Sequence, residues 1–352
     1  MKRLAAALRA SWRHDRDRWL LAAAALALAA TFWQPSLLLE RSLFEHVVVL
    51  DITQSMSVTD QVLAGKPASR LAYAKHALRQ SLLELPCGSK LGWAVFTDYR
   101  AYLLLAPVEV CANLTELRAT LANIDNRMAW SGNSEVAKGL HSALGVARSL
   151  PGKPSLVFVT DGQEAPPLNP RFRPSFDDKP GEVPGLVVGV GELLPSPIPK
   201  SDPGGRPLGF WRADEVAQTD LRSLGRGASV SGEKMVDDGG LPAGSPALGA
   251  TPGLEHLSAL REAYLRTLAG EQGLRFHRLQ SPHGLVDELT SPRLAKPVKA
   301  RADGRVALAA LAFVLLLARC VRPALRASRL RLPSFLRRLR VASSELHGKA
   351  GQ

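Results

Sequence analysis

The stretch HVVVLDITQSMSV, residues His46 to Val58, joins a run of apolar residues to closely spaced oxygen-bearing side chains. Its four apolar residues, 47–50, predict a buried strand of a parallel sheet. Asp51, Thr53 and Ser55 follow at the end of that strand, with one residue between each pair. Open α/β sheets place their ligand sites at the carboxyl ends of strands. Carboxylate and hydroxyl oxygens at that place predict a site for a hard divalent cation such as Mg²⁺.

Two later segments supply further oxygen ligands. In SGNSEVAKGL, a loop of small residues precedes a helix that begins near residue 136, and Ser134 is the expected hydroxyl ligand. In SLVFVTDGQE, the apolar residues 156–159 predict another buried strand, which delivers Asp161 just before the turn residue Gly162. A second interpretation stays open, in which Asp51 and Asp161 only stabilise turns, as aspartate commonly does.

The three segments together resemble a von Willebrand factor A (VWA) domain, whose metal-ion-dependent adhesion site combines D-x-S-x-S, a loop threonine and the aspartate of T-D-G. The resemblance implies that five side chains hold the metal directly or through water: Asp51, Thr53, Ser55, Ser134 and Asp161. Thr53 stands where the family usually has serine, and Ser134 where it usually has threonine. Both departures keep the hydroxyl, so we expect a site of altered affinity.

A narrower resemblance covers roughly residues 46–191. The phrases LPCGSKLGWAVFT, APVEVCANL, RMAWSGNSEVAKGL and FVTDGQEAPPL are similar to the MxaL-type VWA proteins of methylotrophic bacteria, which are encoded beside periplasmic methanol dehydrogenase. That resemblance implies a role in maturation of methanol dehydrogenase or in insertion of its metal, alongside a MoxR-type ATPase and other membrane VWA proteins. Bat-type VWA stress or assembly scaffolds of the membrane are the neighbouring alternative.

The chemistry of the five side chains favours binding over catalysis. Two carboxylates and three neutral hydroxyls do not complete the six oxygens that Mg²⁺ prefers. The open position favours a carboxylate from a partner protein, so we expect a binding module and not an enzyme. A HAD-like phosphohydrolase that uses Asp51 is the enzymatic alternative, but it would need a second acid as general acid/base, and Thr53 occupies that position. A structural membrane scaffold with a vacant site is a third hypothesis.

The net charge of +13 is concentrated at the two ends of the 352-residue chain. Basic residues outnumber acidic ones by four in residues 1–18 and by eight from Arg319 onward, which leaves about one net positive charge between them. A central region without net basic charge argues against nucleic acid as a partner.

Each basic end adjoins an apolar run. Residues 19–39 carry no charge and have the length of roughly 20 residues that a membrane span needs. A shorter apolar run, residues 306–318, lies between Arg305 and Arg319 and forms most of the second expected span, residues 305–321. Because excess Lys and Arg stay in the cytoplasm, we expect a bacterial inner-membrane protein with both termini cytoplasmic, contact with membrane lipid and a periplasmic VWA domain. Two alternatives are open: a cleaved signal peptide with its site at residues 27–29, and a buried core helix for the second run.

Three cysteines fit an oxidising compartment. Cys87 and Cys111 lie in turns that flank two expected neighbouring strands, so either a disulfide or two unpaired thiols is possible, and Cys320 is left over. The sequence has no CxxC and no HExxH, so a zinc site lacks support.

The alternation of strands and helices predicts a doubly wound, mostly parallel α/β sheet flanked by helices, with a transmembrane helix at each end. Strands are expected at residues 47–50, 91–97, 102–105, 156–159, 186–190 and 274–279, and helices at 69–85, 114–123, from 136 onward, and 254–269. The expected division is a basic tail (1–18), a transmembrane helix or signal anchor (19–39), the first part of the VWA domain with the metal site (45–192), a Pro/Gly-rich insertion (193–253), the last helix and strand of the domain (254–282), a second transmembrane helix (305–321) and a basic tail (322–352).

Overall fold

The computed structural model describes residues 18–33, 36–168, 172–202, 204–216, 233–237, 254–303 and 305–330. The chain divides into two units, one of residues 42–298 and one made of the residues before and after that range. Most of the two expected basic tails, residues 1–17 and 331–352, lies outside the described residues, and so do residues 217–232 and 238–253 of the expected insertion.

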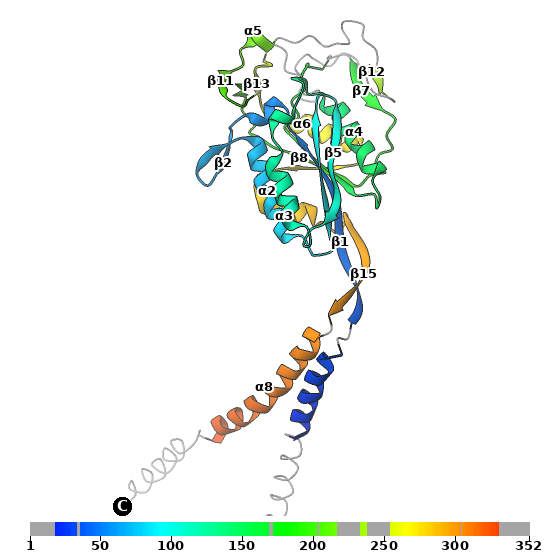
Figure 1. Cartoon of the computed structure of the whole chain (residues 1–352), viewed down its shortest axis with the longest axis vertical. Helices are drawn as coiled ribbons and strands as arrows, with labels where there is room; N and C mark the ends of the chain where they lie inside the picture. The colour runs from blue at the N-terminus through cyan, green and yellow to red at the C-terminus, as the bar shows by residue number, and fades with distance from the viewer. Residues whose placement is uncertain are drawn as a thin grey trace, which may run out of the picture. The chain divides into compact units, whose positions relative to one another are not determined.

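A seven-stranded sheet forms the framework (Figure 1). Its order is β14 (Arg275–Arg278), β8 (Gly185–Gly189), β6 (Ser155–Thr160), β1 (Ser36–Asp51), β4 (Lys90–Thr97) and β5 (Arg100–Glu109), and β15 (Ala295–Asp303) also pairs with β1. All neighbours in this order are parallel except β4 and β5, which are antiparallel. The expected mostly parallel α/β sheet is confirmed.

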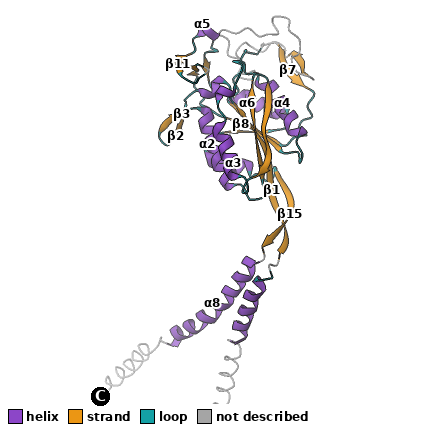
Figure 2. Cartoon of the chain, viewed as in Figure 1, coloured by secondary structure: helices purple, strands orange, loops and turns teal. Residues whose placement is uncertain are grey.

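Helices cover both faces of the sheet (Figure 2). The core on one face includes side chains of α2 (Arg70–Glu84), α3 (Leu114–Asn123) and α7 (Pro282–Leu289). The core on the other face includes side chains of α4 (Val136–Ser149) and α6 (Glu262–Glu271).

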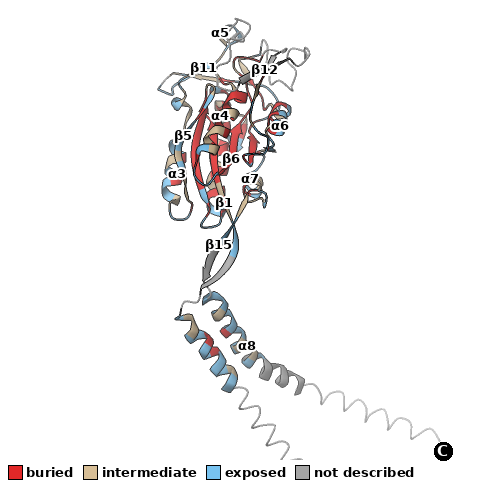
Figure 3. Ribbon diagram, turned by 90° about the vertical axis from the view of Figure 1, so that its right-hand side faces the viewer, coloured by how far each residue is buried: buried red, intermediate tan, exposed pale blue. Residues whose placement is uncertain are grey.

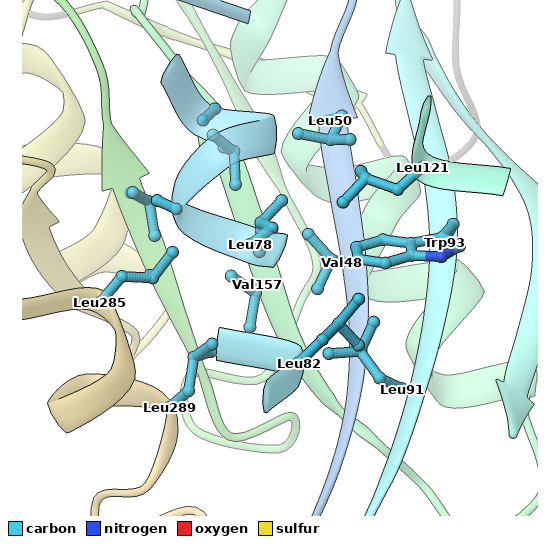
Figure 4. Close-up of a cluster of buried hydrophobic side chains, with 14 of the residues drawn as sticks. Val48, Leu50, Leu78, Leu82, Leu91, Trp93, Leu121, Val157, Leu285 and Leu289 are labelled. Atoms are coloured by element: carbon cyan, nitrogen blue, oxygen red, sulfur yellow. The ribbon is translucent and has the colours of Figure 1, made fainter. Parts of the chain in front are cut away.

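The apolar run of β1 serves both cores because successive strand residues point to opposite faces. Val48 and Leu50 pack in the first core, which Figure 4 shows in close-up, while Val47 and Val49 pack in the second. All four are fully buried, and Figure 3 shows the central strands of the sheet as buried. Full burial of each such side chain contributes on the order of 1.5–3 kcal/mol.

Local signals place the helices. Ser69 caps α2, and its hydroxyl accepts a hydrogen bond from the backbone N of Ala72 at 3.1 Å. Ser281 caps α7 in the same way, with Pro282 in the first turn, where its missing N–H costs nothing. Gly139 lets α4 lie close to the sheet, because a Cβ at this position would stand 2.1 Å from the ring of Phe96.

A disulfide joins Cys87, just after α2, to Cys111, just after β5, with their Cα atoms 5.3 Å apart. It closes a loop across a sequence separation of 24 residues. The bond links the two ends of the β4–β5 hairpin at the side of the sheet where β4 begins.

Several elements differ from the sequence-based expectation. The domain continues beyond the expected last strand, with α7 and β15, and β1 begins at residue 36, inside the run expected to be a membrane helix. The expected helix at 254–269 is shorter and begins at Glu262. Smaller elements are η1 (Gln54–Ser57), β2 (Gln61–Leu63), β3 (Lys66–Ala68), η2 (Asn126–Met128), β7 (Phe172–Phe176), β9 (Ser196–Pro197), β10 (Pro199–Ser201), β11 (Pro207–Phe210), α5 (Ala213–Val216), β12 (Glu233–Asp237) and β13 (Leu257–Ser258).

The terminal unit contains a helix over residues 18–31 and the helix α8 (Arg305–Leu330). Ala24 and Ala27 of the first helix are buried against Ala312 of the second. Within the described residues, no helix combines the length and the apolar character needed to cross a bilayer, so the transmembrane helices expected at 19–39 and 305–321 are not found.

Candidate metal centre

Asp51 is the last residue of β1, and its side chain is fully buried. Its Oδ1 atom accepts hydrogen bonds from the backbone N of Thr53 at 2.9 Å and from the Thr53 hydroxyl at 2.6 Å. Its Oδ2 atom accepts one from the hydroxyl of Thr160, the last residue of β6, at 2.6 Å. The bond to the backbone two residues ahead is that of an Asx-turn, and it carries the chain over the end of β1 into η1.

The polar network continues from Thr53 to Asp161. The hydroxyl oxygens of Thr53 and Ser55 lie 3.3 Å apart, and the Ser55 hydroxyl donates to Asp161 Oδ1 at 3.1 Å. The backbone N of Gln163 also donates to Asp161 Oδ1, at 3.0 Å. Four of the five predicted ligand residues are therefore joined in one continuous buried network.

Ser134 is held beside the same strand ends by its backbone. Its N donates to the carbonyl of Ala165 at 2.6 Å, and its carbonyl accepts from the N of Ala165 at 2.8 Å. It also forms a parallel bridge with Asp98, which follows β4. Its Oγ atom is buried, and no hydrogen-bond partner for it exists among the described residues. A buried hydroxyl that lacks a partner is costly, so this atom has unused capacity to bind a ligand.

A cavity of about 360 Å³ lies over this group of hydroxyls. On the domain side it is lined by Thr53, Ser55 and Ser134, and on the other side by residues of the predicted insertion. Asp51 and Asp161 are not among the lining residues, but they accept hydrogen bonds from the Thr53 and Ser55 hydroxyls. The complete lining is Thr53, Gln54, Ser55, Gly132, Ser134, Gln163, Ala165, Ile198, Trp211, Glu215, Val216 and Glu255.

The electrostatics of the site favour a bound cation. Burial and the charge of the neighbouring Asp161 raise the pKa of Asp51 to about 7. A buried carboxyl group beside a second carboxylate disfavours its own charged form. A divalent cation between or beside them would offset that repulsion, and oxygen donors of this kind suit Mg²⁺.

Three contributors to the site were not predicted from the sequence. Thr160 binds Asp51 as described above, and Arg70 and Ser258 both contact Asp161 Oδ2, at 2.6 Å and 3.1 Å. Thr160 directly precedes Asp161, so its place at the strand end was a usable signal. The position of Arg70 was also a usable sequence signal, because a cation in the first turn of a helix opposes the helix dipole and needs acidic partners.

The residues of this centre coincide with a match to a known family. Residues 46–163 match the model of the von Willebrand factor type A domain. With the sheet described above, this match shows that the chain contains a VWA domain. A search of curated proteins finds no match to this chain.

Several solved structures match part of this chain at low sequence identity. An aerotolerance-related membrane protein from Bacteroides fragilis with multiple mutations to serines is 18% identical, with a TM-score of 0.44, and the match covers 71% of this chain and 98% of that one. An uncharacterised membrane-spanning protein from Vibrio fischeri is 16% identical, with a TM-score of 0.25 and coverage of 69% and 95%. The PilB minor pilin from Streptococcus sanguinis is 14% identical, with a TM-score of 0.37 and coverage of 72% and 61%.

Proposed function

We propose that this chain is a non-enzymatic binding protein whose VWA domain holds Mg²⁺ and uses it to grip a carboxylate of a partner protein. Asp51, Thr53, Ser55, Ser134 and Asp161 hold the cation, directly or through water. The observation that carries the proposal is the buried Ser134 hydroxyl, which has no partner among the described residues and lines the same cavity as Thr53 and Ser55.

The direct test is calorimetric titration of the protein with Mg²⁺, followed by the same titration of Asp51→Asn. This substitution keeps the size of the side chain and removes its charge, so we expect binding to be lost while the circular dichroism spectrum is unchanged. Because a ligand stabilises only the state that binds it, Mg²⁺ at 100 times its Kd should add about 2.7 kcal/mol to the unfolding free energy of the wild type and nothing to that of the variant.

Asp287→Asn is the matched control for this titration. Asp287 lies exposed on α7 and is not among the residues that line the cavity. It should bind Mg²⁺ like the wild type. If the wild type shows neither heat of binding nor stabilisation, or if Asp51→Asn retains both, the metal function is rejected.

The similarity of residues 46–191 to MxaL-type proteins supports a narrower proposal for the partner. We infer that the partner is a periplasmic methanol dehydrogenase undergoing maturation or metal insertion, in the company of a MoxR-type ATPase. A Bat-type assembly scaffold is the alternative, and it would use the same metal site on other partners. Mg²⁺-dependent capture of the dehydrogenase by the wild type, lost with chelator and in Asp51→Asn, would distinguish the two.

Association with a lipid membrane is part of the same proposal. Trp19, Phe32 and Trp33 around the first helix and Val306 and Phe313 of α8 are exposed and apolar or aromatic. Exposed apolar surface of this kind marks interaction sites, and aromatic residues favour the membrane interface. Flotation of the full chain with vesicles of anionic lipid tests this, and a chain that stays at the bottom of the gradient contradicts it.

A further inference from the structure

Arg70 occupies an unusual place for a charged side chain. It is the first residue of α2, directly after the cap Ser69, and its side chain is fully buried. The N-terminus of a helix carries a partial positive charge, so a cation there is disfavoured. A fully buried guanidinium also needs partners for its charge and for its five N–H donors. Its partners therefore reveal why an arginine lies here.

Every N–H group of Arg70 has an acceptor. The Nε atom and one terminal nitrogen donate to Asp60 Oδ2 at 2.9 Å and 2.6 Å. The other terminal nitrogen donates to Asp161 Oδ2 and to the Ser258 hydroxyl, both at 2.6 Å. The fifth hydrogen bond goes to the backbone carbonyl of Ser258 at 3.0 Å. Ser258 itself donates to Asp161 Oδ2 at 3.1 Å, which closes a triangle of Arg70, Asp161 and Ser258.

This triangle divides the two oxygens of Asp161 between two roles. Oδ2 is held by Arg70 and Ser258, whereas Oδ1 faces the Ser55 hydroxyl and the backbone of Gln163. The guanidinium thus fixes the rotation of the carboxylate and presents one defined oxygen to the hydroxyl network. A planar guanidinium can hold two acids in fixed geometry, which the single nitrogen of lysine cannot do.

The surroundings are shaped to hold the guanidinium in place. Gly191 follows β8 with φ +128, and a Cβ on it would stand 2.7 Å from Nε of Arg70. Asp60 is fixed from a second side, because its Oδ2 also accepts from the backbone N of Glu192 at 3.0 Å. Segments that follow β1, β6 and β8 therefore converge on one side chain from α2.

Ser258 links this cluster to the predicted insertion. It ends β13, which pairs with β9 at the start of that region, through Ser258 opposite Ser196. The neighbouring residue Ile198 lines the cavity over the metal centre, and its backbone N donates to the carbonyl of His256 at 3.0 Å. This region thus contacts Arg70 through Ser258 of β13 and lines the cavity through Ile198, which directly follows β9.

We propose that Arg70 is a positioning residue of the metal site, which orients Asp161 and ties it to the strand pair where the insertion leaves and rejoins the domain. Occupancy of the metal site and order in this strand pair are then coupled. The inference rests on the proposed Mg²⁺ function. It adds a chain of contacts through which metal binding affects the cavity wall opposite the hydroxyls.

The test compares Arg70→Lys with the wild type. Lysine keeps the positive charge, so the variant isolates the loss of the five-bond geometry from any change in net charge. Loss of an outer contact to a metal ligand typically weakens metal binding by about 10–100-fold, and we expect a change of that size in the calorimetric Kd for Mg²⁺. Hydrogen exchange supplies the second readout. The amide of Leu260, two residues after Ser258, donates to the carbonyl of Glu192 at 2.8 Å, so it reports on this region together with the amide of Ile198. Mg²⁺ should slow exchange of both amides in the wild type and not in Arg70→Lys.

Two further variants keep the test decisive if Arg70→Lys does not fold. Ser258→Ala removes one hydroxyl of the triangle and should weaken Mg²⁺ binding by roughly 2–10-fold, the usual size for one lost hydrogen bond. Ser155→Ala is its matched control, since Ser155 is also a buried serine but lies at the opposite end of β6. It should leave both the Kd and the exchange pattern unchanged.

The outcomes separate the two proposals. If the wild type does not bind Mg²⁺, the proposed function fails and this inference falls with it. If the wild type binds Mg²⁺ but the Kd of folded Arg70→Lys or Ser258→Ala equals that of the wild type, only the role of Arg70 is overturned. Slowed exchange at Ile198 and Leu260 that persists in those variants likewise overturns the coupling.

Discussion

The segment over which β1 and β6 pair runs from His46 beside Ser155 to Leu50 beside Val159. Both ends of this paired segment carry buried polar groups, yet they differ in how fully these groups are paired. At its beginning, His46 lies between the Ser155 hydroxyl at 3.1 Å and the carbonyl of Leu289 at 3.0 Å. At the other end, the hydroxyl of Ser134 is buried without a partner among the described residues and lines a cavity. Burial of polar groups is thus common to both ends, whereas unused hydrogen-bonding capacity beside a cavity distinguishes the candidate site.

The comparison distinguishes buried polar groups that already have hydrogen-bond partners, and so stabilise the fold, from a buried hydroxyl that can still accept a ligand. The first end is also closed covalently by the disulfide between Cys87 and Cys111. The second end is held by noncovalent contacts of the described residues, among them the ion pairs of Arg70 with Asp60 and Asp161. We therefore expect changes at the first end to alter stability alone, and changes at the second to alter metal binding.

The largest effect on stability is expected from the disulfide. Replacing Cys87 and Cys111 together by serine should lower the unfolding free energy by about 3.5 kcal/mol, because the unfolded chain regains the freedom of a loop of about 25 residues. Urea denaturation measures this change. Mg²⁺ affinity should be unchanged, and a clear loss of affinity would show that the two ends are not independent.

A somewhat smaller, pH-dependent effect is expected at His46. Burial lowers the pKa of His46 from 6.5 to about 4, so the folded state holds the ring neutral while the unfolded state gains a proton below pH 6.5. The stability that depends on the neutral ring is present above pH 6.5 and is lost as the pH falls towards 4, by up to about 3 kcal/mol.

His46→Gln checks this effect because glutamine does not titrate. Urea denaturation between pH 7 and pH 4 should show a steeper loss of stability for the wild type than for the variant. Parallel curves for the two proteins would contradict the assignment of His46 as a buried neutral residue.

The smallest effect on stability is expected from Ser134→Ala. Its hydroxyl makes no hydrogen bond among the described residues, so its removal should change the unfolding free energy by less than about 0.5 kcal/mol while weakening Mg²⁺ binding at least about tenfold. Ser155→Ala should do the reverse, with a loss of at least about 1 kcal/mol for the hydrogen bonds of its hydroxyl with the His46 ring and the carbonyl of Glu45, and with unchanged Mg²⁺ binding. Equal effects of the two variants on Mg²⁺ binding would erase the distinction between the strand ends.

Much of the fold could be predicted from local sequence patterns. The apolar run before Asp51 and the cap at Ser69 are local signals, and the structure has a strand and a helix at those places. β15 was missed because its sequence AKPVKARAD contains a proline and four charged residues, and most of its apolar side chains are small alanines, which favour strands weakly. The leucines at 37–39 were assigned to a membrane helix because apolar composition alone does not distinguish a helix from a strand, and the structure places them in β1.

Some residues of the candidate site could also be predicted from local sequence patterns, and others could not. The five residues predicted as ligands stand in two recognisable motifs and one loop, and the structure brings them to one edge of the sheet, although metal binding itself stays a prediction. Ser258 could not be found from the sequence, because its place depends on the return of the chain after the insertion. Arg70 could have been suspected from its position at a helix start, but its partners lie in segments that no local pattern connects to it.

The long reach of Arg70 has a consequence for the order in which the protein can mature. Ser258 follows Arg70 by 188 positions, so a growing chain contains the guanidinium and Asp161 well before the residue that completes their triangle is synthesised. Chains that end before Ser258 would carry the ligand residues without their final support. If the chain binds Mg²⁺ as proposed, full metal affinity would arise only after Ser258 has been synthesised and has joined Arg70 and Asp161.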